Sequence, residues 1–454
     1  MGMQQQPEQR QQPERQGQGR GSFLRAPFSV FYGWWIVASS LTLATLYSAF
    51  FFYDFTLFVT PIREELPGVG NAINTAFFIA SMNSAIMSPV LGAIFDRRGP
   101  KAVAGGGLAL GAIGFATMGV MTEPWHLYIG FTLAGFGPIV FFSAALPSVV
   151  NWFFRMRGRA IGICMSGLGL GGFLTIPSLF VIEEIGWRNT FLLMAAIIAV
   201  LVPLMTIVLR HTPEQYGMRP DGDPPTVSAS GVTQLEEPVY GLTFTEAVRA
   251  PVFWFLGTLF FLAFWCIGAL TVHQSPFMEA AGYSRTDAAF AVGAMAVITV
   301  VGRIFAGWMA DATDPRRAAV LAFVLQAVGI SAFALSNPDQ NWYLVVFLLA
   351  FSPGFGMITV LQAALLATYL GRRAFGVLQG ILWTVTALAV SVAPTVATFA
   401  DNSLGGMQNG FLMFGAFSAI GLILVYLVLP RPGIVRARGR SIVPPQPTSS
   451  ATGG

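Results

Sequence analysis

A ten-residue pattern occurs twice in this chain, and the repetition constrains the fold more than any other feature. Residues 92–101 read GAIFDRRGPK and residues 307–316 read GWMADATDPR, with a glycine, an aspartate, a proline and a basic residue at matching places. Two further pairs keep nearly the same offset: residues 159–162 and 373–376, then 186–192 and 406–412. Because each offset is about 215 to 220 residues, the chain consists of two half-chains that follow one another in the same order.

The hydropathy of the chain indicates a membrane protein. Hydrophobic residues make up 54% and charged residues 10%, and the mean hydropathy is +0.65. A helix that crosses a bilayer needs about 20 mostly apolar residues, because lipid offers no partner to free backbone groups. Six such spans are predicted before the chain centre and six after it: 33–60, 72–95, 101–121, 126–150, 160–183 and 190–209, then 252–273, 288–310, 317–335, 342–369, 374–399 and 410–429.

The basic residues predict the orientation of these spans. Most of the 25 Lys and Arg residues fall in the loops and tails on one side, and short loops rich in Lys and Arg stay in the cytoplasm. Arg63, Arg188 and Arg285 lie on the opposite side, and Arg303 lies within a span. We therefore expect both termini and the central loop to be cytoplasmic.

The polar segments divide the chain into five parts. We expect a disordered tail over residues 1–29, a six-helix bundle over 30–210, a linker over 211–250, a second bundle over 251–430 and a second disordered tail over 431–454. Pro and Gly in the linker argue against a folded insert, although a short interfacial helix is expected within 241–250.

Several classes of function are excluded or disfavoured by composition. The net charge of +4 follows from the distribution of basic loops and indicates no nucleic-acid partner. Cys164 and Cys266 both fall in apolar spans and imply no disulfide framework. The loops leave no room for a soluble catalytic domain, and no metal-ligand cluster or nucleophile with a base occurs at membrane depth. We expect no enzyme activity and no cofactor.

The repeated loop resembles the signature between the second and third helices of the major facilitator superfamily. The resemblance implies an all-α membrane fold with twelve helices in two pseudo-symmetric bundles, and a latch that forms and breaks as the bundles rock. A loop that only carries positive charge is the alternative. The residues assigned to the latch are Gly92, Asp96, Arg97, Gly99 and Lys101, with Gly307 and Asp311 in the second half.

Within that superfamily, four segments resemble the monocarboxylate transporters and the oxalate-formate antiporter group. These segments are residues 152–172, 213–222, 302–303 and 370–376. The first helix departs from the family, since its glycine-rich acidic entry is reduced to residues 32–35, which read YGWW.

Arg303 is the strongest candidate for a substrate anchor. It lies eight residues before Asp311, which places it about 12 Å inside a core about 30 Å thick. An Arg at this depth is costly and can hold a carboxylate through two hydrogen bonds. In the resembled family, an Arg at this place binds the substrate carboxylate. A bond to a helix-end carbonyl or to Asp311 is the alternative.

Other residues are expected to line the site. Dicarboxylate-handling relatives carry a second basic residue in the eleventh helix, where this chain has Thr386, so one cation suits one carboxylate. Packing is the alternative role for the aromatic candidates. The further substrate-binding candidates are Asn83, Phe142, Trp383, Thr386 and His273.

Two residues are candidates for proton coupling. Thr299 stands where proton-coupled relatives have an acid, so another group must carry the proton. Asp54 follows an aromatic run and suits this role, although a solvated carboxylate or a helix cap would explain it too. His273 ends the predicted seventh span and could titrate or bond to backbone.

Together these features predict a secondary active transporter that moves a small monocarboxylate by alternating access, coupled to protons. Proton-driven efflux of hydrophobic compounds and carboxylate exchange are the alternatives, and a non-transporting receptor is a more distant one. We expect a monomer in the plasma membrane, with a bacterial inner membrane favoured by the compact loops.

Overall fold

A computed structural model describes residues 30–66, 72–223, 226–227, 233–234, 241–427, 436–437 and 440–441. The tail predicted over residues 1–29 lies outside the described residues, as do most of the tail predicted over 431–454 and part of the linker.

The described chain is almost wholly helical. The first half contains α1 (Gly33–Tyr47), the π-helix η1 (Ser48–Tyr53), α2 (Phe55–Glu65), α4 (Ala72–Arg98), α5 (Pro100–Gly119), α6 (Pro124–Ala134), α7 (Phe136–Val140), the π-helix η2 (Phe141–Ala145), α8 (Leu146–Trp152), α9 (Arg157–Leu170), the 3-10 helix η3 (Gly171–Leu174) and α10 (Thr175–Val208). The second half contains α11 (Phe244–Arg249), α12 (Pro251–Ala280), α13 (Arg285–Ala312), α14 (Pro315–Ala334), the 3-10 helix η6 (Pro338–Gln340), α15 (Trp342–Leu370), α16 (Phe375–Leu404) and α17 (Met407–Leu427).

Between the halves, residues 211–223 form two short 3-10 turns, η4 (Glu214–Tyr216) and η5 (Pro220–Gly222). Two pairs of two-residue antiparallel strands lie outside the bundles, β1 (Thr226–Val227) with β2 (Thr233–Gln234) and β3 (Arg436–Ala437) with β4 (Arg440–Ser441). The short helix expected within 241–250 is α11.

The described residues contain eleven helical stretches that are long and apolar enough to cross a membrane. One of them, Arg157–Val208, has 52 residues, so a straight helix would be about 78 Å long, more than twice the thickness of a bilayer core. Its backbone turns at Gly186, where φ is 79° and ψ is 160°. The stretch therefore crosses twice, and the prediction of six and six spans is confirmed.

Three helices extend five or more residues beyond their predicted ends, and one of them is α16, which ends at Leu404 and not at residue 399. The first span continues past residue 60 through η1 and α2 to Glu65. The seventh continues past His273 to Ala280, because Pro276 is accommodated within α12. His273 therefore lies inside a helix and not at its end.

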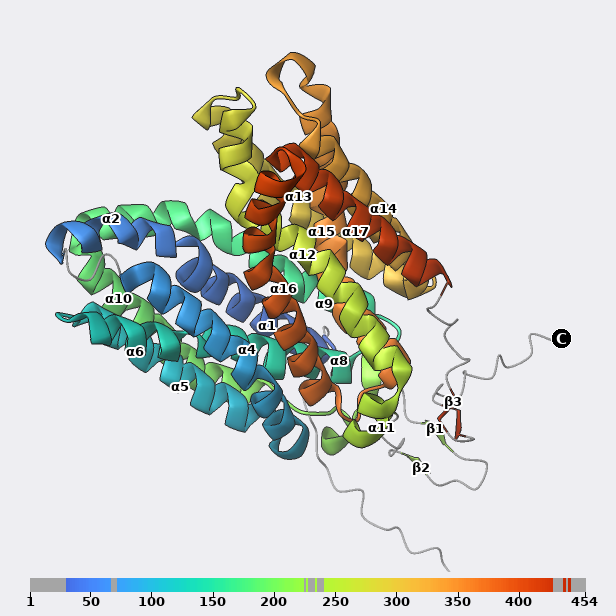
Figure 1. Ribbon diagram of the computed structural model, residues 1–454. Coiled ribbons are helices and arrows are strands. Elements are labelled where there is room, and N and C mark those ends of the chain that lie inside the picture. The colour runs from blue at the N-terminus through green and yellow to red at the C-terminus, as the bar shows by residue number, and fades with distance from the viewer. Residues whose placement is uncertain are drawn as a thin grey trace, which may run out of the picture.

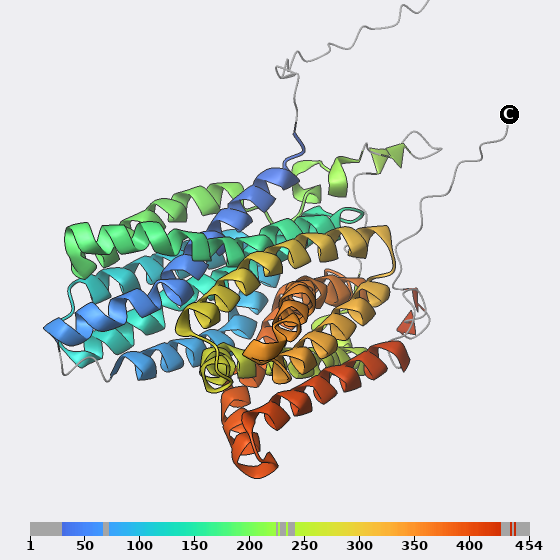
Figure 2. The ribbon, with the colours of Figure 1, turned by 90° about the horizontal axis from the view of Figure 1, so that it is seen from above.

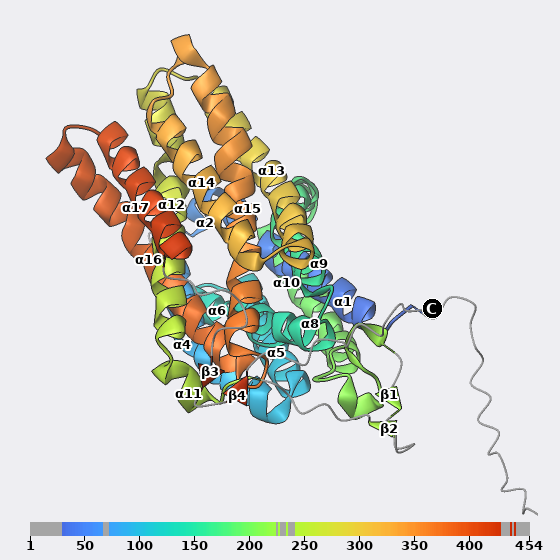
Figure 3. The same ribbon diagram turned by 90° about the vertical axis from the view of Figure 1, so that its right-hand side faces the viewer.

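The two halves form separate bundles that meet at one end of the molecule and splay apart at the other. In Figure 1 the blue-to-green half extends to the left and the yellow-to-red half extends upward, and α4 with α16 and α9 with α13 form the junction between them. Figures 2 and 3 show the same two bundles from above and from the side. We call the joined end the latch end, because it carries the loop of residues 92–101.

Glycines permit the close approach at the latch end. A Cβ atom added to Gly92 would lie 2.2 Å from the carbonyl oxygen of Gly376. One added to Gly380 would lie 2.6 Å from that of Ser88. Any larger residue would push α4 and α16 apart, so these positions determine how tightly the halves close.

Candidate functional site

The two aspartates of the repeated pattern each bind the beginning of a helix in the opposite half. Asp96 on α4 accepts hydrogen bonds of 2.9 Å from the backbone N–H groups of Gly376 and Val377 on α16. Asp311 on α13 accepts bonds of 2.5 and 2.9 Å from the N–H groups of Gly158 and Arg159 on α9. The duplication of the sequence therefore appears in space as two equivalent contacts.

These contacts are electrostatically favourable. The first N–H groups of a helix have no partner within the helix and carry a partial positive charge. A carboxylate beside them satisfies two donors and interacts favourably with the helix dipole. Arg159 adds a weaker attraction, since its Nε lies 3.9 Å from Oδ2 of Asp311. The arrangement joins the two halves without requiring a second buried ion.

The other predicted latch residues surround these aspartates. Gly92 and Gly307 lie at the helix contacts, where each has the backbone of the opposite half within 2.5 Å of an added Cβ. Gly99 has φ of 77° and lets the chain turn between α4 and α5. Arg97 and Lys101 are exposed. Their side chains are placed to contact anionic lipid headgroups or water rather than the opposite half.

Arg303 lies on α13, in the interior between the halves, and is only 5% exposed. Its Nε donates a 3.3 Å hydrogen bond to Oγ1 of Thr359 on α15. Its Nη1 is buried and has no hydrogen-bond partner within the described residues. The guanidinium carbon lies 5.9 Å from the ring centroid of Phe355. An anion bound here would accept a hydrogen bond from this unused donor and balance the buried positive charge.

Two tyrosines of the first half approach this guanidinium. Tyr53 and Tyr47, from η1 and α1, are close enough to Arg303 to interact with it electrostatically. A Cβ added to Gly169 on α9 would lie 3.0 Å from Nη1. The free donor is therefore directed toward the first half. The site combines a cation from one bundle with phenol groups from the other.

The structure shows neither alternative partner for Arg303. The carboxyl of Asp311 is used at the start of α9, and Arg303 makes no ion pair within the described residues. Its Nε bond is to a side-chain hydroxyl and not to a helix-end carbonyl.

An aromatic chain links this site to the junction of the halves. The ring of Tyr47 lies 5.6 Å from that of Phe141, and Phe141 lies 4.9 Å from Phe142. Phe142, in η2, stacks on Trp383 of α16 with centroids 3.8 Å apart and planes 20° apart. The structure brings these two predicted residues together from opposite halves, which no spacing in the sequence indicates.

Three other predicted residues bond within their own half. Nδ2 of Asn83 donates to the carbonyl oxygen of Thr132 at 3.3 Å. The Thr386 hydroxyl donates to the carbonyl oxygen of Trp383 at 3.1 Å. Nε2 of His273 lies 3.1 Å from the carbonyl oxygen of Pro394. None of these bonds connects its residue to Arg303.

Asp54 lies between η1 and α2 and is fully buried. Its Oδ2 accepts a 2.6 Å hydrogen bond from the Ser178 hydroxyl on α10, and Oδ1 has no partner within the described residues. It is not a solvated carboxylate, and its side chain makes no capping bond at the start of α2. A buried carboxyl with one unpaired oxygen is expensive as an ion.

Sequence reasoning missed Tyr47, Tyr53 and Thr359. Tyr53 stands directly before Asp54 in the aromatic run, and Thr359 is one of the few polar residues of the tenth span, with Ser352, Gln362 and Thr368. Only the packing of α15 and α9 against α13, with α1 in turn packed on α9, places these groups beside Arg303.

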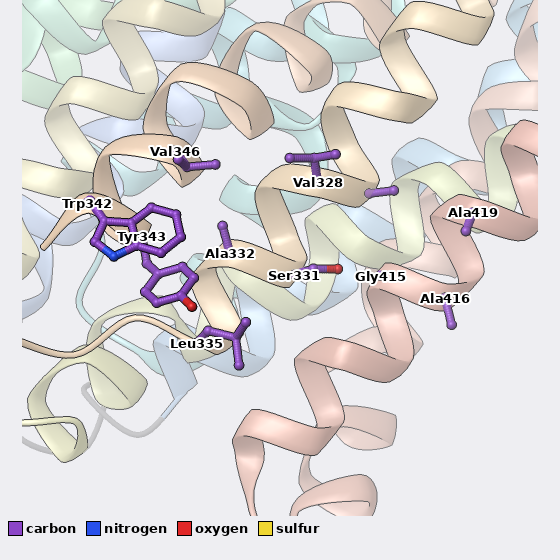
Figure 4. Close-up of a pocket in the computed structure, with 11 residues that line it drawn as sticks. Val328, Ser331, Ala332, Leu335, Trp342, Tyr343, Val346, Gly415, Ala416 and Ala419 are labelled. Atoms are coloured by element: carbon purple, nitrogen blue, oxygen red, sulfur yellow. The ribbon is translucent and has the colours of Figure 1, made fainter. Parts of the chain in front are cut away.

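A separate groove of about 560 Å³ lies on the second half between α14, α15 and α17. Figure 4 shows Val328, Trp342 and Ala419 along it, together with Ser331. It contains no charged lining residue and is formed by helices that do not carry Arg303. It is not part of the candidate site.

Comparison with known proteins agrees with the fold. The sequence profile of the Major Facilitator Superfamily matches residues 26–394, so the chain belongs to this superfamily. It is accordingly a multi-pass membrane transporter and not an enzyme. An oxalate:formate antiporter of Oxalobacter formigenes is 24% identical over 388 residues, covering 84% of this chain and 88% of the antiporter. Human monocarboxylate transporter 11 is 28% identical over 364 residues, covering 76% and 72%.

Solved structures support the same fold. A human organic anion transporter superimposes with a TM-score of 0.66 at 15% identity, over 87% of this chain and 99% of that chain. The fucose:proton symporter of E. coli superimposes with a TM-score of 0.63 at 14% identity, over 86% and 98%. At these identities the likeness establishes the architecture of two six-helix bundles.

Proposed function

We propose that this chain is a secondary active transporter of a small monocarboxylate, driven by protons and operating by alternating access. The observation that supports the substrate class best is the buried guanidinium of Arg303, whose Nη1 has no partner within the described residues. The names of its relatives, an oxalate:formate antiporter and several monocarboxylate transporters, point to small carboxylates.

Charge and surroundings favour one carboxylate with a small apolar body. The guanidinium supplies one positive charge, and Thr386 adds none at the place where dicarboxylate-handling relatives have a cation. Phe355 offers apolar surface beside the anchor, and the aromatic chain from Tyr47 through Phe142 to Trp383 continues that surface toward the junction. In this proposal the substrate carboxylate accepts a hydrogen bond from Nη1 of Arg303. Tyr47 and Tyr53 close the site from the first half.

Asp54 is the coupling group in this proposal. It is buried and follows Tyr53, which interacts with Arg303, so a single residue connects the carboxyl of the first half to the anion site. Burial makes the ionised form of this carboxyl energetically unfavourable. The carboxyl therefore takes up a proton readily when the site opens to the more acidic side of the membrane. His273 is the second candidate, and its Nε2 lies 3.1 Å from the carbonyl oxygen of Pro394 on α16, which is the backbone contact given as the alternative to titration.

The rocking of the two bundles supplies the transport step. The present state is joined at the latch end through Asp96 and Asp311 and splayed at the other end. We assign the latch end to the cytoplasm, because Arg97 and Lys101 lie there and basic loops stay inside. The structure is then the outward-facing state, with both termini in the cytoplasm and the chain acting as a monomer in a plasma membrane, most simply a bacterial inner membrane.

The test is ligand-induced thermal stabilisation of the purified protein by a panel of monocarboxylates and dicarboxylates, with Arg303→Gln in parallel. A ligand that binds the folded state at about 100 times its Kd stabilises it by about 2.7 kcal/mol. We expect one or more monocarboxylates to raise the melting temperature of the natural chain and none to raise that of the variant. Equal shifts in both proteins would contradict the role of Arg303, and uptake by proteoliposomes would identify the transported acid.

No stabilisation by any acid, together with stabilisation by lipophilic compounds, would instead support proton-driven efflux. Acid-for-acid counterflow without net proton movement would support exchange.

A further inference from the structure

The first part of the central linker is fixed to the first half. The carbonyl oxygens of Arg210 and His211 accept hydrogen bonds of 3.1 Å from Trp152 Nε1 and Asn151 Nδ2. The Arg210 guanidinium also lies between two rings, 4.0 Å from Tyr32 and 4.2 Å from Tyr216. We call residues 210–223 the strap. Its beginning is held by side chains of α8 and by an aromatic residue before α1.

The far end of the strap is fixed to the same half. The carboxylate of Asp221, which has a φ of 60°, accepts hydrogen bonds from three successive backbone N–H groups before α9. These donors belong to Phe154, Arg155 and Met156, at 3.0, 2.7 and 3.3 Å. Asp223 forms an ion pair with the Arg155 side chain. The strap therefore moves with the first half as a rigid extension, contrary to the unfolded linker expected from its Pro and Gly content.

One side chain of the strap reaches the other half. Glu214 forms an ion pair with Arg372, which precedes α16, and the two side chains are 13% and 4% exposed. Nη1 of Arg372 also donates a 2.8 Å hydrogen bond to the carbonyl oxygen of Asn151 on α8. Arg372 is thus held by two groups of the first half at once.

The chain has joined the second half by residue 242. The backbone N–H of Leu242 donates a 2.9 Å hydrogen bond to the carbonyl oxygen of Leu370. Residues 210–223 and 242–250 therefore belong to different bundles, and the segment between them connects bodies that must separate when the latch end opens. Glu214 and Arg372 lie on opposite sides of that division.

We propose that the strap is a third closure of the latch end, which holds the outward-facing state through the Glu214–Arg372 ion pair. It differs from the Asp96 and Asp311 contacts because the central linker occurs once and has no repeated counterpart. Opening of the latch end hydrates both charges together, so the natural pair separates at moderate cost. Removal of one partner leaves the other buried and uncompensated in the closed state only, so it favours opening.

The experiment measures the populations of the two states without substrate. Cys164 and Cys266 are replaced by alanine, spin labels are attached through Val120→Cys and Leu335→Cys at the splayed end, and their distance distribution is recorded in nanodiscs. A shorter distance reports closure of the splayed end and opening of the latch end. We expect Glu214→Gln and Arg372→Gln each to raise the ratio of short to long distances about tenfold.

Two further proteins separate this proposal from a general loss of structure. The double variant Glu214→Gln with Arg372→Gln leaves no lone buried charge in the closed state, so it should lie closer to the natural distribution than either single variant. Asp223→Asn removes an exposed ion pair that lies within the first half, and it should leave the distribution unchanged. Natural distributions in both single variants, an equal shift in Asp223→Asn, or a double variant shifted as far as the sum of the single variants would each overturn the proposal. Because no substrate is present, the result is independent of which acid the chain carries.

Discussion

Gly158 and Gly307 lie backbone to backbone across the junction of the two halves. A Cβ on Gly158 would be 2.3 Å from the carbonyl oxygen of Gly307, and a Cβ on Gly307 would be 2.4 Å from that of Gly158. The N–H of Gly158 at the same place donates to Asp311. The glycine contact and the carboxylate contact therefore depend on one another, because the hydrogen bond forms only when the helices are this close.

Gly307→Ala should weaken closure of the latch end. The added methyl group lies below contact distance to rigid backbone, so α13 must move away from α9 and lengthen the bonds to Asp311. We expect slower transport and a larger inward-facing population in the spin-label measurement. Gly293→Ala is the matched control on the same helix, since nothing lies within 4 Å of its added Cβ. Equal effects of the two substitutions would show that helix propensity, and not contact, is responsible.

Asp96→Asn should also favour the inward-facing state. Asparagine keeps one acceptor but loses the charge and one of the two bonds to the start of α16. Loss of a carboxylate at a helix N-terminus costs about 1 to 2 kcal/mol, which is about 5 to 30-fold in the ratio of states. Asp311→Asn should act in the same direction through α9. Unchanged transport rates and unchanged state populations in Asp96→Asn would remove Asp96 from the latch.

Arg303→Lys should bind substrate far more weakly than the natural chain, although it keeps the positive charge. Lysine lacks the planar pair of donors that a carboxylate accepts, and it cannot place one donor on Thr359 while another meets the ligand. We expect at least a tenfold rise in the apparent Kd, about 1.4 kcal/mol, measured by ligand titration of the purified variant. Arg157→Lys, at a buried Arg whose Nε donates to the carbonyl oxygen of Phe153 within the first half, should leave this Kd within twofold.

Asp54→Asn should separate substrate movement from proton movement. The amide cannot lose a proton, so uphill accumulation driven by a pH gradient should disappear while counterflow of labelled substrate continues. Ser178→Ala, which removes the hydroxyl bonded to Oδ2, should shift the pH dependence of uptake but preserve accumulation. Persistence of gradient-driven accumulation in Asp54→Asn would transfer the coupling role to His273, which the parallel His273→Gln variant tests.

Closure of the latch end should weaken in acid through His211. Burial lowers the pKa of this histidine, and Arg372 lowers it further while Glu214 opposes the effect. Its ring also packs on Phe95 and against Gly99. An open latch end hydrates His211 and returns its pKa toward about 6.5.

The sign of the effect follows from these two states. Above about pH 6.5 the ring is neutral in both, so its contribution to closure is complete. As the pH falls from there toward the lowered value, the open state takes up a proton that the closed state refuses, and closure is progressively lost. His211→Gln should remove this dependence from the spin-label populations measured between about pH 7.5 and 5.5.

Sequence periodicity and repetition were sufficient for the architecture. Long apolar stretches can satisfy their backbone groups in lipid only as helices. The number and order of the spans therefore follow from the pattern of hydropathy along the sequence. The duplicated pattern singled out Asp96 and Asp311, which the structure places in two equivalent contacts, and the depth of Arg303 in its span singled it out as the proposed anchor. The helix end at His273 was misplaced, because a proline such as Pro276 is tolerated within a membrane helix.

Tertiary structure alone decided which groups meet. The stacking of Phe142 on Trp383, the approach of Tyr53 to Arg303 and the pairing of Glu214 with Arg372 all join residues from separate segments, and no periodicity encodes them. The folded strap arises in the same way, since Asp221 finds its donors only after α8 and α9 are packed. The sequence by itself determined the helices, their duplication and the rare buried charges, because lipid penalises every unsatisfied polar group locally. The partners of those charges depend on how two bundles pack at one end, which is a property of the assembled surfaces.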